Sequence, residues 1–279
     1  MSVRARLAAL SGSALLYAAA YAVRVEPYAF QVRAITLILP RLEQAFHGFR
    51  LAHISDIHIN GWMTPARLAA LIPLVNAQGA DAIAITGDIL SSHSRYDAAA
   101  LTAALGALRA PEGVFAVLGN HDHRHPTGPE GIRRVLQAAG IIELANRVHT
   151  LRRGEATLHL AGVDDMAFRR ARLDYVLAAL PPEGAALLLA HEPDFADVSA
   201  ATSRFDLQLS GHTHGGQVHL PPFGPLALPR YGMRYPAGLY RARDMYVYTN
   251  RGLGTGHLRA RFNCRPEITV FTLWARHPR

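Results

Sequence analysis

The sequence has only one cysteine, Cys264, among its 279 residues. A single cysteine cannot form a disulfide within the chain, and it excludes a zinc site built from several thiolates. Any metal site in this protein must therefore be built from nitrogen and oxygen ligands.

Acidic residues are also fewer than basic ones, with 21 Asp and Glu against 29 Lys and Arg, and the formal net charge is +8. This balance favours nucleic acid, anionic lipid or a phosphorylated substrate as a partner, although arginine spread over a solvated surface explains it as well. No run of five or more basic residues interleaved with aromatics occurs. We therefore do not expect nucleic acid as a partner, and we expect a monomer.

Residues 7–23 (LAALSGSALLYAAAYAV) carry no charge over seventeen positions. This length suits a short membrane helix, and we predict that residues 1–29 anchor the protein to the inner membrane. A cleaved signal peptide is the alternative, because AAAYA has the small residues that a signal peptidase accepts, and it would export the protein to the periplasm. An ordinary buried helix is a third interpretation. Arginines flank both ends, so charge does not decide on which side of the membrane the protein lies.

After about residue 30, short apolar runs alternate with amphipathic stretches, and half of all residues are apolar, enough for a full core. Helical spacing predicts helices over residues 64–79 and 96–108. The apolar runs predict buried strands, which alternate with these helices as in a βαβ arrangement. The runs in this first half are 34–39, 50–55, 82–86 and 114–119.

The second half contains more strand-like runs than one small parallel sheet can hold. These runs are 157–163, 185–192, 206–212, 245–250 and 267–273. We therefore predict an α/β fold of two stacked mixed sheets with helices outside, preceded by the N-terminal hydrophobic helix. Because no internal repeat or linker is visible, one catalytic domain over residues 30–279 is the simplest organisation.

Metal-binding residue types follow five of the predicted strands, at the ends where open α/β sheets place their ligands. These residues are Asp56 and His58, Asp88, Asn120 with His121 and Asp122, His191, and finally His212 with His214. In Asp56-x-His58, an extended backbone would point both side chains the same way. Without His121 and Asp122 these residues make seven ligands, which are too many for one ion with an open position. Seven ligands suit two ions that share a carboxylate, for which Asp88 is the natural candidate. Two such cations activate water and bind phosphoryl oxygens, which predicts phosphoester hydrolysis.

The motifs SDIH, GD, GNHD, a lone His and GHTH, in this order, resemble the calcineurin-like metallophosphoesterases. The resemblance covers residues 48–275 and implies a four-layer αββα sandwich with two divalent metal ions, typically manganese, iron or zinc. The stretches GHTHGGQ, AHEPDF and TNRGLGT resemble sequences of the bacterial membrane-associated phosphodiesterases of this superfamily. The hydrophobic N-terminal segment is similar to theirs as well. Some of those hydrolyse UDP-2,3-diacylglucosamine.

The resemblance also implies a role for each matching residue. His121 would donate a proton to the leaving-group oxygen, and Asp122 would orient His121. Ser91 stands where many relatives have a second Asp, so the environment of the ligands differs from theirs. The first metal would be held by Asp56, His58 and His214, the second by Asn120, His191 and His212, and Asp88 would bridge them.

These observations predict a dinuclear phosphoesterase that hydrolyses a phosphodiester or pyrophosphate bond, in a lipid-linked substrate such as UDP-2,3-diacylglucosamine. A nuclease or cyclic-nucleotide phosphodiesterase is the enzymatic alternative. A metal-stabilised binding scaffold without activity is the alternative from a different class.

Overall fold

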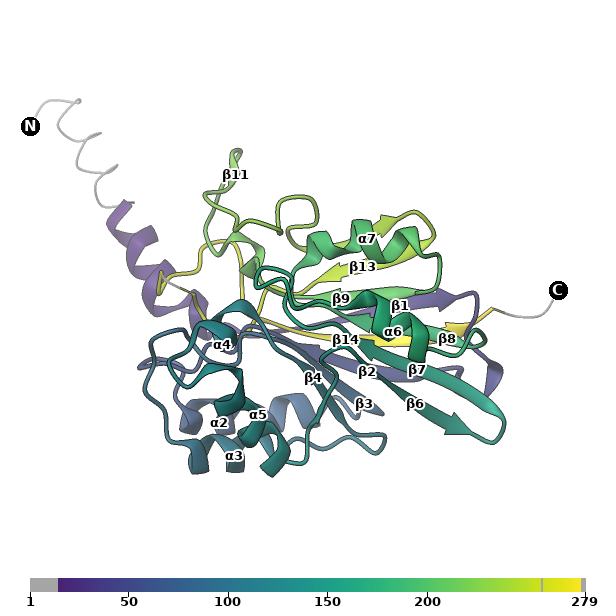
Figure 1. Cartoon of the computed structure of the whole chain (residues 1–279). Coiled ribbons are helices and arrows are strands. Elements are labelled where there is room, and N and C mark those ends of the chain that lie inside the picture. Colours follow the sequence, from purple (N-terminus) through teal and green to yellow (C-terminus); the bar gives the residue numbers. More distant parts are fainter. Residues whose placement is uncertain (1–14, 257, 277–279) are drawn as a thin grey trace, which may run out of the picture.

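Two six-stranded mixed sheets form the centre of the protein (Figure 1). The computed structural model describes residues 15–256 and 258–276. The first sheet has the order β1 (Gln31–Leu39), β14 (Glu267–Ala275), β2 (Phe49–Ile54), β3 (Ala82–Thr86), β4 (Val114–Val117), β5 (Ile142–Glu143). The second sheet has the order β12 (Gly238–Ala242), β13 (Met245–Thr249), β9 (Leu207–Ser210), β8 (Ala185–Leu189), β7 (Ala156–Gly162), β6 (Arg147–Arg153). The predicted pair of mixed sheets is confirmed.

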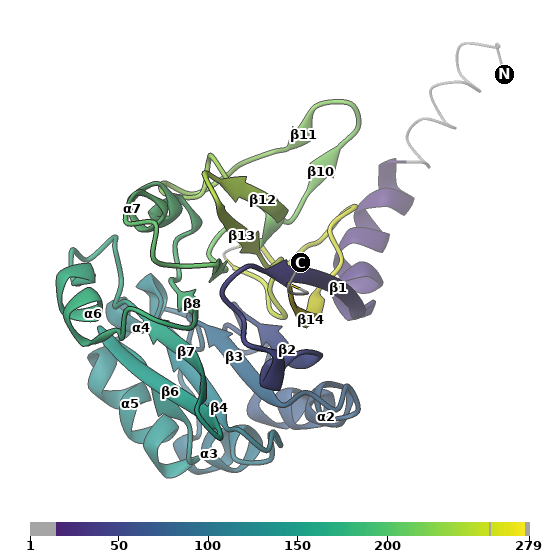
Figure 2. The ribbon, with the colours of Figure 1, turned by 90° about the vertical axis from the view of Figure 1, so that its right-hand side faces the viewer.

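Three hydrophobic clusters hold the layers together, and Figure 2 shows the layers edge on. The central cluster lies between the sheets and includes Leu51 of β2, Phe115 of β4 and Leu187 of β8. A second cluster joins the first sheet to its helices, and a third joins the second sheet to its own. The helices on the first sheet are α2 (Pro65–Asn76), α3 (Ala98–Leu105) and α5 (Gly128–Ala138), and those on the second are α6 (Leu173–Ala179) and α7 (Ala196–Ala201).

Local sequence signals account for the elements that were predicted. Thr64 caps α2, because its side chain accepts a hydrogen bond from the Arg67 N–H, and Pro65 occupies the first turn. All five residues of β3 are buried, as a continuous apolar run between two layers requires. The helix predicted over 64–79 ends earlier, at Asn76, and the one over 96–108 spans Ala98–Leu105.

The position of β14 could not be predicted from local patterns. This last strand runs parallel to β1, with Gln31 opposite Glu267, and antiparallel to β2, with Thr269 opposite His53. It therefore lies between the first two strands of the chain. Other elements were also missed: the helices α5, α6, α7 and α4 (Asn120–Arg124), the strands β5, β6, β12, β10 (His219–Leu220) and β11 (Gly224–Pro225), and the 3-10 turns η1 (Glu26–Tyr28), η2 (Gln44–Phe46), η3 (Pro193–Phe195) and η4 (His214–Gly216).

The chain before β1 packs against the domain. Residues 15–24 are helical, and the Ala22 carbonyl accepts a hydrogen bond from the Arg261 N–H at 2.8 Å. Glu26 is buried and its carboxylate accepts from the N–H groups of Asn263 and Cys264. No helix within the described ranges is long and apolar enough to cross a membrane, so the predicted hydrophobic helix is not supported there. Residues 7–14 of that predicted segment lie outside the described residues.

Candidate dinuclear metal centre

The predicted ligands converge at one edge of the paired sheets. Each follows a strand that runs parallel to its neighbour, so their carboxyl ends meet: β2, β3 and β4 in one sheet, β8 and β9 in the other. Three groups of ligand atoms result, and within each group the atoms lie within 4.8 Å of one another. The groups are Asp56 with His58 and His214, Asp88 with His191 and His212, and Asp88 with His58 and His121.

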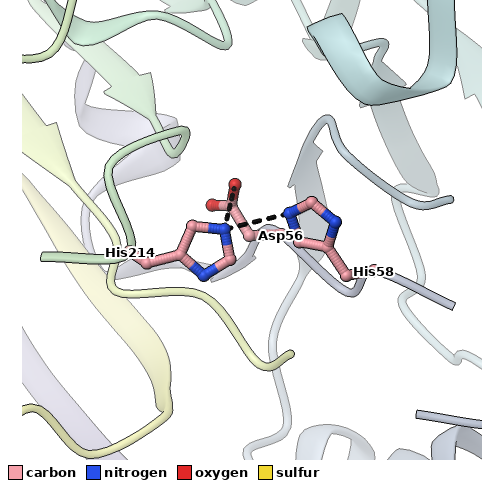
Figure 3. Close-up of side chains that lie close together, drawn as sticks. All are labelled: Asp56, His58 and His214. Atoms are coloured by element: carbon pink, nitrogen blue, oxygen red, sulfur yellow. Dashed lines mark hydrogen bonds and ion pairs between the residues drawn. The ribbon is translucent and has the colours of Figure 1, made fainter. Parts of the chain in front are cut away.

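The first group joins residues that are more than 150 positions apart in the sequence (Figure 3). The Nε2 atoms of His58 and His214 lie 2.9 Å apart, and His214 Nε2 lies 3.5 Å from an oxygen of Asp56. All three side chains are buried. Two ring nitrogens at this distance repel each other unless a proton or a cation lies between them. The donor set therefore fits a metal ion.

Asp88, a member of the second group, also lies close to the first. One of its oxygens is 3.5 Å from His58 Nε2 and 3.3 Å from His191 Nε2. The Nδ1 of His212 lies 3.2 Å from that same His191 nitrogen. Asn120 lines a cavity together with Asp88 and His212, and its buried side-chain oxygen has no hydrogen-bond partner within the described structure. A carboxylate reaching both groups, with a buried unpaired carbonyl oxygen beside it, has the geometry expected of a bridged pair of sites.

The backbone at the ligands is left-handed, not extended. Asp56 and His58 have φ angles of 48° and 51°, so the extended Asp-x-His geometry predicted from the sequence is wrong. Asp88, His212 and His214 also have positive φ angles, of 51°, 72° and 52°. Such conformations are uncommon for residues other than glycine and cost about 1–3 kcal/mol each. The surrounding structure imposes this strain at five of the seven predicted ligands.

Gly211, in the GHTHGG stretch, allows the two sheets to approach closely. A Cβ atom at this position would stand 2.3 Å from Asp56 Oδ2 and 1.9 Å from the hydroxyl oxygen of Ser55. The His212 N–H then donates to both Asp56 oxygens at 3.0 Å. Glycine is thus required here for contact between the loops after β2 and β9.

Partners outside the centre fix three of the imidazole rings. His191 Nδ1 donates to the Thr86 carbonyl at 2.7 Å, which leaves Nε2 directed at Asp88. His212 Nε2 donates to the Arg230 carbonyl at 2.8 Å, which leaves Nδ1 directed at the centre. His58 Nδ1 contacts the Ser91 hydroxyl at 3.2 Å. Ser91 therefore takes part in orienting a ligand, as partners of metal-binding histidines usually do.

The electrostatics of the centre also fit cations. Burial raises the pKa of Asp56 to about 7, opposed by the charge of His191 and reinforced by that of Asp88. Burial acts in the same direction on Asp88, but His191 holds the Asp88 pKa well below its usual range. Burial disfavours charge on His191, yet Asp88 raises the His191 pKa well above its usual value. The buried carboxylates need compensating positive charge, and divalent cations would supply it.

His121 stands beside the centre, at the start of α4. Its ring packs edge-on against that of His58 with centroids 4.7 Å apart, and its main-chain N–H donates to Asp88 at 2.7 Å. The ring Nδ1 lies 2.8 Å from the hydroxyl oxygen of Ser92, a residue that sequence reasoning missed. This contact holds the His121 ring beside the centre.

The Asp122 carboxylate binds main-chain groups of two loops. Its oxygens accept from the N–H groups of Ile89, Leu90 and Gly119, at 3.2, 2.8 and 3.0 Å. Asp122 thus fixes the loops after β3 and β4 relative to each other. It positions His121 through the backbone. That it orients the His121 ring stays a prediction.

Two cavities meet at His121, which lines both. The larger, of about 610 Å³, is lined by Asp88, Asn120 and His212, and also by two arginines, Arg124 and Arg230. The smaller, of about 520 Å³, is lined mostly by residues with polar side chains, such as Asn60, Ser92 and Arg95. The sequence did not predict either arginine as a site residue. Only the fold of the surrounding chain brings each of them to the cavity.

Comparison with known proteins yields one family and several relatives. The calcineurin-like phosphoesterase family matches residues 49–216. The metallophosphoesterase YkuE of Bacillus subtilis is 35% identical over 255 residues, which cover 91% of this chain and 88% of that protein. The phosphodiesterase YaeI of Escherichia coli is 32% identical, over 81% of this chain and 82% of that protein. A transmembrane protein with a metallophosphoesterase domain from Danio rerio is 32% identical, over 86% of this chain and 56% of that protein.

Proposed function

Because this chain belongs to the calcineurin-like phosphoesterase family and is a metal-dependent phosphoester hydrolase, we propose that it cleaves a phosphodiester or pyrophosphate bond in a lipid-linked substrate. UDP-2,3-diacylglucosamine is one substrate of this kind. The observation that carries the proposal is the convergence of Asp56, Asp88 and the buried imidazoles at one edge of the sheets.

Members of this family use two divalent metal ions, and the residues present suit both. Bound there, the ions would activate a water molecule and neutralise the phosphoryl oxygens. We assign Asp88 to both ions, because its carboxylate reaches both groups. We assign Asp56, His58 and His214 to the first ion, and Asn120, His191 and His212 to the second.

The protein's own side chains would do the remaining work. The His121 ring, whose Nδ1 contacts Ser92, donates a proton to the leaving-group oxygen. Arg124 and Arg230 border the cavity and attract the negatively charged substrate. Asp122 keeps the loop that carries His121 in place.

A nuclease or cyclic-nucleotide phosphodiesterase is the second candidate, favoured by the net charge of +8 and the arginines at the cavity. Such an enzyme would lose affinity steeply as salt is raised and would be indifferent to detergent micelles. The non-catalytic scaffold is set aside, because family membership indicates an enzyme.

An activity panel tests the proposal. The full chain, loaded with Mn²⁺, is assayed with bis-p-nitrophenyl phosphate, with p-nitrophenyl phosphate, and with UDP-2,3-diacylglucosamine in detergent. We expect metal-dependent cleavage of the diester and the lipid-linked pyrophosphate, with the monoester slower. Cleavage of the monoester alone would contradict the proposal.

We also propose that the N-terminal segment associates with the inner membrane. The apolar sequence of residues 7–14 continues into a helix that exposes Leu15, Leu16 and Tyr17 to solvent. Export to the periplasm after cleavage is the alternative. Fractionation of cells that produce the protein, with amino-terminal sequencing, distinguishes the two.

A further inference from the structure

The larger cavity beside the metal centre has two chemically different walls. One wall is polar and includes Asp88, Asn120 and His121. Another part of the lining is apolar and comes from the segment around the β10–β11 hairpin and from Leu258. Its apolar residues are Val218, Leu226, Ala227, Leu228, Pro229 and Leu258. A phosphate group needs no such wall, so it must face an apolar part of the substrate.

The hairpin also exposes apolar side chains that nothing in the described structure covers. Phe223, at its tip, is 84% exposed, and Leu226, which lines the cavity, is 60% exposed. Leu220 on the same hairpin is 39% exposed. Large apolar side chains exposed together on a protruding hairpin mark a surface that contacts another apolar phase.

The hairpin and the N-terminal helix leave the body of the protein at the same end. Figures 1 and 2, which differ by a quarter turn, both show β11 and the helix of residues 15–24 projecting beyond the sheets there. That helix exposes Leu15, Leu16 and Tyr17, and the sequence before it is apolar. A single lipid surface can therefore contact both projections.

We propose that the apolar wall holds the aliphatic chain of an amphiphilic phosphodiester, and that the tip of the hairpin, at Phe223, lies in the bilayer that supplies it. This inference rests on the proposed function and narrows its substrate class. The occupant is a lipid chain, because both the wall and the tip are apolar and the tip lies at the same end as the exposed apolar helix.

The smaller cavity, which His121 also lines, receives the hydrophilic half of the same substrate. It is lined by Asn60, Ser92, His93, Ser94 and Arg95, which offer hydroxyl, amide, imidazole and guanidinium groups. His121 and Gly256 line both cavities, so the two meet where the phosphorus would be attacked. Water adds to phosphorus, the bond to the leaving-group oxygen breaks, and His121 protonates that oxygen.

A pair of chromogenic diesters tests the chain site. The Mn²⁺-loaded full chain is assayed with methyl p-nitrophenyl phosphate and with dodecyl p-nitrophenyl phosphate below its micellar concentration. We expect kcat/KM to be at least 10-fold higher for the dodecyl diester. In Leu226→Asp and Leu228→Asp this preference falls at least 10-fold, since a carboxylate in the wall repels the chain. Tyr175→Asp, which places the same charge on α6 at a side chain 56% exposed, keeps the preference.

The outcomes separate this inference from the proposed function. If the wild-type protein cleaves both diesters with equal efficiency, or if both wall variants keep the preference, the chain site is wrong while phosphodiester hydrolysis stands. If neither diester is cleaved in the presence of Mn²⁺, the proposed function itself fails. Metal content of each variant confirms that it is folded.

A second measurement tests the contact of the hairpin with the bilayer. The dodecyl diester is presented in phosphatidylglycerol vesicles and, separately, dissolved below its micellar concentration. In Phe223→Asp we expect the ratio of the vesicle rate to the dissolved rate to fall at least 5-fold, because a charged tip cannot enter the lipid. Tyr175→Asp should keep the wild-type ratio. An unchanged ratio in Phe223→Asp would overturn the bilayer contact.

Discussion

Asp88 is the side chain that connects the two halves of the candidate centre. Its carboxylate lies within 3.5 Å of both His58 and His191, and it also accepts the main-chain N–H of His121. One residue thus links the two proposed ion sites to the proposed proton donor. Substitutions at this position and at His121 should therefore have different consequences.

We expect Asp88→Asn to lose bound metal. The amide cannot carry the negative charge that a shared ligand supplies, so the metal content should fall from two ions per chain to about one or fewer. Elemental analysis after dialysis measures this directly. Two ions per chain in the variant would contradict the bridging role.

His121→Ala should instead keep both ions and lose turnover. The ring lies next to the centre and is not one of the proposed ligands, so its removal leaves the donor set complete. General acid catalysis contributes about 10²–10⁴-fold, and kcat should fall by that factor. Metal analysis and steady-state kinetics on the same preparation provide the test, and wild-type turnover in the variant would refute the role.

We expect His53 to make the folded protein sensitive to acid. Its ring is fully buried, its Nε2 contacts the Thr86 hydroxyl at 2.8 Å, and burial lowers its pKa to about 3. Below about pH 6.5 the His53 ring binds a proton in the unfolded chain but stays neutral in the folded chain. His53 therefore lowers the free energy of unfolding by up to ~1.4 kcal/mol per pH unit as the pH falls from about 6.5 towards 3.

Denaturant unfolding at pH 5 and pH 7 tests this expectation with His53→Gln, which can still bond to Thr86. The variant should lose less stability between the two pH values than the wild-type protein. Its unfolding at pH 8, where His53 is neutral in both states, gives the cost of the substitution itself. Equal losses in both proteins would show that His53 does not cause the pH dependence.

At the scale of elements, the loops that follow the parallel strands form the site. Hydrophobic runs that end in SDIH, TGD, GNHD and GHTH could be recognised in the sequence, because each buried strand and its loop are contiguous. The left-handed backbone at Asp56 and His58 could not, since their conformation is imposed by loops from other strands. The same holds for Ser92 beside His121 and for the Arg230 carbonyl that orients His212.

Gly211→Ala tests the close approach of the loops after β2 and β9. The added Cβ would stand 2.3 Å from Asp56 Oδ2, so the Asp56 side chain must move. We expect affinity for the first metal ion to fall at least ~10-fold, as it does when groups that orient ligands are disturbed. Gly61→Ala is the matched control, because a Cβ there meets nothing within 4 Å. Metal titration of both variants should separate them, and similar affinities would count against the packing role.

At the scale of the whole molecule, the N-terminal segment is coupled to the metal centre. Glu26 accepts from the N–H groups of Asn263 and Cys264, and the Cys264 thiol contacts the His214 carbonyl at 3.2 Å. The N-terminal segment is thus connected to His214, a proposed ligand, by two successive contacts. Glu26 contacts Cys264, and Cys264 contacts His214.

Two truncations distinguish a role of the N-terminal segment in membrane anchoring from a role in stabilising the domain. Removing residues 1–14 should leave thermal unfolding and hydrolysis of bis-p-nitrophenyl phosphate close to those of the full chain. Removing residues 1–28 also removes Glu26 and leaves two main-chain N–H groups without their acceptor, at a cost of about 1–3 kcal/mol each. The longer truncation should therefore unfold at a lower temperature. Equal melting temperatures would show that the segment gives the domain no support.

The sequence by itself determined the two mixed sheets, the family and the identity of the candidate ligands. Those features follow from short contiguous patterns, in which a buried strand ends at a metal-binding residue. Only the tertiary structure decided where β14 lies, which groups hold His121 and His212, and how the apolar hairpin stands against the metal centre. Each of these depends on contacts between residues that local patterns do not link, and such contacts form only when the strands pair into sheets and the loops at their ends come together.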